Sequence, residues 1–151
     1  MNRLFTLAAL LGIFVAETAS AQCTGLRYRD IMFDDTTISN ITYGQNVNLS
    51  NGNATLRLDV WMPKNDTVTN RPLIIIAHGG NFLGGSKTGS DVLQFCNDFS
   101  DMGYVVASID YRVGMTNFPF PGPDSTDATE AVIRAVHDAK AAVRFFKKDV
   151  S

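Results

Sequence analysis

The fold is decided by one stretch of sequence, Arg71-Pro-Leu-Ile-Ile-Ile-Ala-His-Gly-Gly-Asn-Phe-Leu-Gly-Gly85. Its apolar, β-branched run from Leu73 to Ala77 predicts a buried strand. The run stops at His78, and two glycine pairs follow, Gly79-Gly80 and Gly84-Gly85. Glycine adopts backbone conformations that other residues avoid, so this segment predicts a turn whose N–H groups can point into a cleft.

The segments around this turn predict strands that alternate with helices. Strands are expected at residues 26–33, 55–62, 73–77 and 104–109, with a weaker one at 38–43. Helices are expected from about Ser90 to Met102, where Gly103 ends the helix, and from about Asp127 to Lys148. This alternation predicts a single α/β domain with a partly parallel sheet.

Apolar side chains recur at spacings that assign each element one buried face. In the second of these strands, Leu56, Leu58, Val60 and Met62 share a face. The expected stripe of the first helix is Val92, Phe95, Cys96, Phe99 and Met102, and that of the second is Val132, Val136, Ala139, Val143 and Phe146.

The first 21 residues have the features of a secretory signal peptide. Arg3 precedes an apolar run from Leu4 to Ala16, and Ala19-Ser20-Ala21 fits the small-residue cleavage pattern. The alternative is an amphipathic or buried N-terminal helix. We expect a secreted or periplasmic protein that begins at Gln22 and has no membrane segment after cleavage. The net charge of −2, without a basic stripe, argues against a nucleic-acid partner.

The two cysteines, Cys23 and Cys96, both follow the expected cleavage site. Export makes a disulfide between them chemically possible, and we predict one. The alternative is that Cys96, on the apolar face of the first helix, is a buried free thiol.

Four segments in this order resemble the α/β-hydrolase superfamily, and more narrowly its carboxylesterase and lipase group. They are Leu58-Asp-Val-Trp-Met-Pro63, His78-Gly79-Gly80, Asp110-Tyr111-Arg112 and Asp138-Ala-Lys-Ala-Ala-Val-Arg-Phe145. The resemblance implies that residues 22–151 form the N-terminal half of an α/β-hydrolase domain, a mostly parallel sheet with flanking helices. In that fold the strand at 73–77 pairs with the strand after Tyr104.

The resemblance also implies roles for the glycine-rich turn. Gly80 and Asn81 match positions whose backbone N–H groups form an oxyanion hole, while His78 and Gly79 support the turn. Asn81 departs from the glycine or alanine common there, but asparagine tolerates unusual dihedral angles. The alternative is a purely structural turn between strand and helix.

The nucleophile of such an enzyme is expected in a Gly-x-Ser-x-Gly turn, which residues 1–151 do not contain. Ser86 follows Gly84-Gly85 but belongs to the oxyanion region, Ser151 lacks the flanking glycines, and His137 is expected to be a surface residue. We therefore expect an incomplete chain, truncated before the nucleophile, that holds no catalytic serine, acid or base. Asp110-Tyr111-Arg112 is expected to form a structural hydrogen-bond network.

The predicted function is hydrolysis of a small-molecule or polysaccharide ester, with no cofactor because no metal-ligand spacing or phosphate loop is present. One alternative is a non-catalytic remnant or interaction module, and another is an exported peptidase of the same fold. Residues 22–151 alone are expected to be inactive. Truncation would leave residues 73–77 as an apolar, unpaired sheet edge that favours aggregation.

Overall fold

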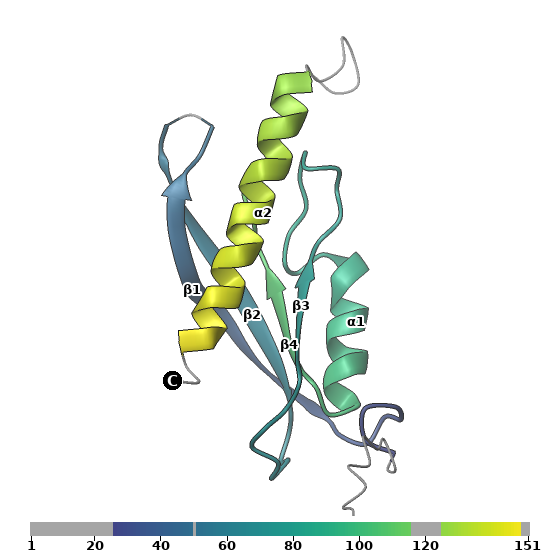
Figure 1. Cartoon of the computed structure of the whole chain (residues 1–151). Coiled ribbons are helices and arrows are strands. Elements are labelled where there is room, and N and C mark those ends of the chain that lie inside the picture. The colour runs from purple at the N-terminus through teal and green to yellow at the C-terminus, as the bar shows by residue number, and fades with distance from the viewer. Residues whose placement is uncertain (1–25, 50, 116–124, 149–151) are drawn as a thin grey trace, which may run out of the picture.

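The computed structural model describes residues 26–49, 51–115 and 125–148. Along the chain it contains β1 (Asp35–Val47), β2 (Asn53–Pro63), β3 (Leu73–Ala77), α1 (Ser90–Asp101), β4 (Val105–Ile109) and α2 (Ser125–Lys148). Figure 1 shows the two helices beside a twisted sheet, with the long α2 crossing it and α1 next to β3 and β4. The described part of the chain is therefore an α/β structure, as the sequence predicts.

The four strands form one sheet in the order β1-β2-β4-β3. β2 pairs antiparallel with both β1 and β4, whereas β3 and β4 run parallel, with Leu73 opposite Val105 and Ala77 opposite Ile109. The predicted pairing of residues 73–77 with the strand after Tyr104 is confirmed. β3 lies at the edge of the described sheet, also as expected.

The two faces of the sheet bury different side chains, one set against each helix. Leu56, Leu58 and Val60 of β2 form one core with Ala107 and Ile109 of β4 and with Ala142 of α2. Trp61 and Val106 face the other way and form a second core with Cys96 of α1. The predicted shared face of β2 is confirmed, and the sheet is the middle of three layers.

α1 begins and ends where the sequence predicts. Asp91 lies in its first turn, where a negative charge is favourable, and Gly103 follows it with a φ of +106° that suits glycine. The predicted stripe is wrong at Phe95, which is 55% exposed. Val92, Cys96 and Ser100, spaced four residues apart, are the buried centre of the helix, so Phe95 lies at its margin.

The buried face of α2 also differs from the prediction. Val132, Val136 and Val143 are 43–45% exposed, whereas Ala131, Asp138 and Ala142 are buried. Asp138 points inward because its carboxylate pairs with Arg112, which follows β4. This pair sets the rotation of the helix, and the small alanines allow it to lie close to the sheet.

The strand predicted at residues 26–33 is wrong, because residues 26–30 form a turn. Tyr28 has a φ of +66°, and its N–H donates to the carbonyl of Met102, after α1. The N–H of Met32 likewise donates to the carbonyl of Asp101, so the segment is held to the end of α1 rather than to a strand. The weak strand predicted at 38–43 is the centre of the longer β1.

Several predictions fall on residues that the structure does not describe. They include the signal peptide, residues 1–21, and Cys23. Cys96 is a buried free thiol in the structure, and with Cys23 outside the described residues the disulfide stays a prediction. In the ranges 26–49, 51–115 and 125–148, no helix combines the length and hydrophobicity needed to cross a membrane.

Candidate active-site loop

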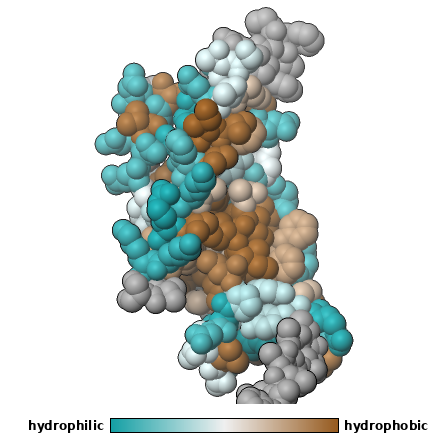
Figure 2. Space-filling view, in the orientation of Figure 1, coloured by the Kyte–Doolittle hydropathy of each residue, from teal (hydrophilic) through white to brown (hydrophobic). Residues whose placement is uncertain are grey.

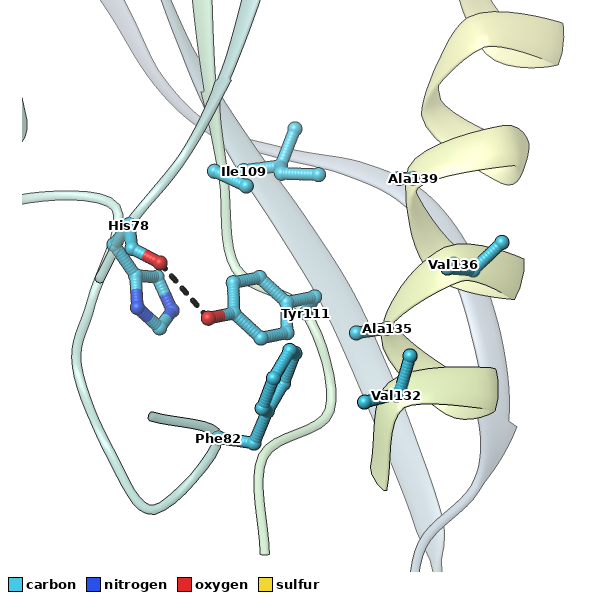
Figure 3. Close-up of a pocket in the computed structure, with 9 residues that line it drawn as sticks. His78, Phe82, Ile109, Tyr111, Val132, Ala135, Val136 and Ala139 are labelled. Atoms are coloured by element: carbon cyan, nitrogen blue, oxygen red, sulfur yellow. Dashed lines mark hydrogen bonds between the residues drawn. The ribbon is translucent and has the colours of Figure 1, made fainter. Parts of the chain in front are cut away.

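The candidate site lies where the parallel strands β3 and β4 end at the same edge of the sheet. β3 runs into the glycine loop, which we define as residues 78–89, and β4 runs into Asp110-Tyr111-Arg112. Functional groups gather at the carboxyl ends of parallel strands in α/β proteins. Figure 3 shows side chains from both segments lying opposite α2.

The backbone of the glycine loop is left-handed at three successive residues. The φ angles are +117° at Gly80, +52° at Asn81 and +60° at Phe82. Asparagine tolerates this region, as expected for Asn81, but a phenylalanine is strained there. The turn is closed by the N–H of Leu83, which donates to the carbonyl of Gly80 at 2.9 Å. The carbonyl of Phe82 accepts from Gly114 at 2.7 Å and from Met115 at 3.0 Å.

One glycine of each pair, Gly80 and Gly85, packs too closely against the rest of the loop to carry a side chain. A Cβ atom on Gly80 would lie 2.2 Å from the carbonyl oxygen of Gly84. A Cβ on Gly85 would lie 2.2 Å from Nδ1 of His78. Both positions also have positive φ, so a larger residue would be excluded by sterics and by backbone strain together.

Several amides of this loop donate to no described residue, and those of Gly80, Asn81 and Gly85 belong to exposed residues. In the part of the chain that the structure describes, no hydrogen bond uses the N–H of Gly80 or Asn81, and both residues are exposed. The preceding amide differs, because the N–H of Gly79 donates to Oδ2 of Asp91 at 3.0 Å. The geometry is consistent with the expected oxyanion role of Gly80 and Asn81, which stays a prediction.

His78 is buried, at 4% exposed, and contacts both the glycine loop and Tyr111. Its Nδ1 lies 2.7 Å from the carbonyl oxygen of Gly79. A carbonyl only accepts, so Nδ1 carries the hydrogen of this bond. Its ring stacks on Tyr111 with centroids 4.4 Å apart, and the Tyr111 hydroxyl donates to the His78 carbonyl at 2.8 Å. These contacts suit the expected support role of His78.

Burial also changes the chemistry of Tyr111. It raises the pKa of the phenol, and the negative charge of Asp91 adds to this effect. A neutral hydroxyl keeps its proton and so remains a donor to the loop.

Asp110-Tyr111-Arg112 forms the structural network that the sequence predicts. The Asp110 carboxylate accepts the N–H of Lys87 at 2.7 Å. Arg112 donates through Nε and Nη2 to the two carboxylate oxygens of Asp138, each at 2.8 Å, and through Nη1 to the carbonyl of Val47 at 2.7 Å. The exposed position of His137 next to this pair agrees with the expected surface residue.

Sequence reasoning missed a second buried ion pair, which joins the glycine loop to β2. Nζ of Lys87 lies 2.9 Å from Oδ2 of Asp59, and both side chains are almost completely buried. The available signal was Asp59 itself, the lone carboxylate of β2, which lies between the apolar residues Leu58 and Val60. Its partner could not be inferred because it lies 28 residues away along the chain.

A pocket of about 310 Å³ opens between the glycine loop, the sheet and α2. It is lined by Ala77, His78, Phe82, Ile109, Tyr111, Val132, Ala135, Val136 and Ala139. Figure 3 shows Phe82 and Tyr111 between the loop and the helix. Figure 2 shows a continuous hydrophobic surface beside α2, where Figure 1 places β3 and β4. Among the described residues, no three His, Cys, Asp or Glu side chains are grouped as metal ligands.

Comparisons with known proteins agree with this architecture. The sequence matches the BD-FAE family over residues 58–151, more than half of the chain. Esterase B from Lactobacillus rhamnosis, solved with a tributyrin phosphonate inhibitor, is similar with a TM-score of 0.51 at 18% identity. That alignment covers 76% of this chain and 31% of the esterase. A search of curated proteins found no match.

A second solved structure gives the same result. Brefeldin A esterase, a bacterial homologue of human hormone-sensitive lipase, has a TM-score of 0.51 at 20% identity. The alignment covers 78% of this chain and 28% of that enzyme, so the chain spans about a third of the length of both esterases. The family match over residues 58–151 and the shared fold show that this chain belongs to the BD-FAE family and forms an N-terminal part of an α/β-hydrolase, carboxylesterase-like fold.

Proposed function

We propose that the protein hydrolyses carboxylic esters and that the glycine loop stabilises the oxyanion of the reaction. The observation that carries this proposal is that Gly80 and Asn81 are exposed residues whose N–H groups donate to no described residue. They lie at the carboxyl end of β3, where the backbone has the left-handed turn described above. Donors held in place before reaction stabilise developing charge without reorganisation.

In the proposed reaction a serine oxygen attacks the ester carbonyl carbon while a histidine accepts the serine proton. The carbonyl oxygen becomes anionic and accepts the N–H groups of Gly80 and Asn81. The alcohol then leaves with that proton, and water hydrolyses the acyl-enzyme to release the acid. Residues 1–151 contain no Gly-x-Ser-x-Gly, so the proposal assigns the serine, histidine and acid to other residues of the whole protein.

The proposed substrate is a small-molecule or polysaccharide ester outside the cytoplasm. Membership of the BD-FAE family and the fold shared with two esterases support ester chemistry. The apolar run and cleavage pattern of residues 1–21 support export to the periplasm or medium.

The test uses the complete protein and measures hydrolysis of p-nitrophenyl acetate, an acetylated polysaccharide and a peptide p-nitroanilide. We expect turnover of the esters and none of the anilide. Turnover of the anilide alone would favour a peptidase, and no turnover of any substrate would favour a non-catalytic interaction module. Residues 22–151 expressed alone are expected to be inactive.

A pair of glycine variants tests the role of the loop. Gly80→Ala places a Cβ against the Gly84 carbonyl and displaces the donors, so kcat should fall about 10²–10³-fold. Gly84→Ala is the matched control, because nothing lies within 4 Å of a Cβ at that position. If both variants are folded by circular dichroism and have equal kcat values, the glycine loop does not stabilise the oxyanion.

A further inference from the structure

We propose that Lys87 is a positioning residue that fixes the glycine loop against the sheet and so sets the direction of the Gly80 and Asn81 amides. Lys87 is far from those amides along the loop and touches neither. Its catalytic consequence rests on the proposed function, whereas its effect on the loop does not.

Lys87 is held by three separate groups. Its N–H donates to Oδ1 of Asp110 at 2.7 Å, and its carbonyl accepts the Ser108 hydroxyl at 2.8 Å. Its ammonium group donates to Oδ2 of Asp59 at 2.9 Å. The backbone and the side chain of one loop residue are thus tied to β2, to β4 and to the residue after β4.

The acceptor of the ammonium group is itself fixed. Oδ1 of Asp59 accepts the N–H of Asn40 at 2.6 Å, where the pairing of β1 with β2 shifts register. Asn40 has a φ of +62°, and this irregularity directs its N–H toward the carboxylate. Both oxygens of Asp59 are therefore engaged, and the carboxylate cannot rotate away from Lys87 without breaking a bond.

A buried ion pair contributes little net stability, since a well-packed apolar pair often serves as well. What a charged pair adds here is a defined position, because Lys87 and Asp59 have side chains only 9% and 3% exposed. The carboxylates that face the ammonium and amide groups of Lys87 are those of Asp59 and Asp110.

The constraint at Lys87 reaches the candidate donors through the glycine pairs. Gly85, two residues before Lys87, lies against the His78 ring, and the Gly84 carbonyl lies against Gly80. If Lys87 moves, this second glycine pair moves with it, and the surface on which Gly80 rests is lost. The amides of Gly80 and Asn81 would then sample several directions instead of one.

The test is Lys87→Met in the complete protein, measured by amide hydrogen exchange. The reporters are the N–H groups of Gly79 and Leu83, which donate to Asp91 and Gly80. We expect their exchange to accelerate about tenfold more than that of the amides of β2 and β4, which report on global unfolding. If the enzyme is active, kcat should fall about 10–100-fold with KM unchanged, because the donors act on the transition state.

Two further variants separate positioning from stability. Leu56→Ala removes a core side chain outside this network, so it should lower the melting temperature without selective exchange in the loop. Lys87→Met combined with Asp59→Leu replaces the ion pair by apolar groups. It should restore the melting temperature toward wild type but leave the loop exchanging fast.

Unchanged exchange at Gly79 and Leu83 in Lys87→Met, or wild-type exchange in the double variant, would overturn the inference. An inactive wild-type protein would instead count against the proposed ester hydrolysis, and the exchange measurements would still test Lys87. The two failures are therefore distinguishable.

Discussion

Removing the carboxylate of Asp138 should be among the most damaging single changes in the described fold. Asp138→Leu keeps the branched shape of the side chain but leaves the Arg112 guanidinium without its counter-ion. Their side chains are 1% and 7% exposed, so water cannot replace the lost partner. Arg112 would retain its bonds to the carbonyls of Val47, at 2.7 Å, and Arg134, at 3.4 Å.

The size of the effect follows from this burial. Breaking a buried ion pair by removing one partner destabilises by about 3–5 kcal/mol, because an uncompensated charge stays in the interior. With a urea m-value of about 2 kcal/mol/M, a loss of 4 kcal/mol lowers the unfolding midpoint by about 2 M. Asp138 is also the residue that orients α2, so the near-ultraviolet circular dichroism should weaken as well.

The assay is urea unfolding of the complete protein followed by circular dichroism. Glu130→Gln is the matched control, because it breaks an ion pair with Arg134 on the same helix while the Glu130 side chain is 55% exposed. That change should cost under about 1 kcal/mol. A midpoint shift for Asp138→Leu no larger than that of Glu130→Gln would refute the reasoning.

Three other outcomes can be measured on the same protein. Gly85→Ala should lower the unfolding free energy by about 1–3 kcal/mol, because the new Cβ meets the imidazole 2.2 Å away, and a urea midpoint equal to wild type would contradict this. Burial raises the pKa of the Cys96 thiol to about 11, so iodoacetamide at pH 8 should modify it only after unfolding. If Cys96 is modified in urea without a reductant, it is a free thiol. If it is not modified under those conditions, the disulfide to Cys23 is supported. Hydrogen bonding from Arg27 holds the pKa of the Asp66 carboxyl well below its usual range, so this pair stabilises fully above about pH 4 and less as the pH falls further. In Asp66→Asn the unfolding free energy should therefore fall less steeply below about pH 4 than in the wild type. An equally steep fall would argue against this role of the pair.

Local patterns were enough to predict most of the elements. The alternation in residues 55–62 and the β-branched run at 73–77 each contain a buried face within a few residues, and β2 and β3 follow them. Residues 26–33 alternate almost as well but form a turn, because Tyr28 adopts a positive φ and the segment bonds to the end of α1. Alternation alone cannot distinguish those two outcomes.

The buried ion pairs could not be predicted from the sequence. Lys87 and Asp138 look like solvated residues when each is considered with its neighbours along the chain. Their partners, Asp59 and Arg112, come near them only because β4 lies between β2 and β3 and because α2 crosses the sheet. The glycine-rich turn could be predicted because its chemistry is local, whereas the residues that hold it in place could not.

The left-handed turn at Gly80-Asn81-Phe82 has a consequence for engineering this protein for heat resistance. A phenylalanine at a φ of +60° strains the backbone and lowers the unfolding free energy by about 1 kcal/mol or more. Phe82→Gly would relieve this strain. The same change would remove a wall of the pocket beside the loop. Selection for thermal tolerance alone should therefore favour loss of the Phe82 side chain, and selection for turnover should restore it.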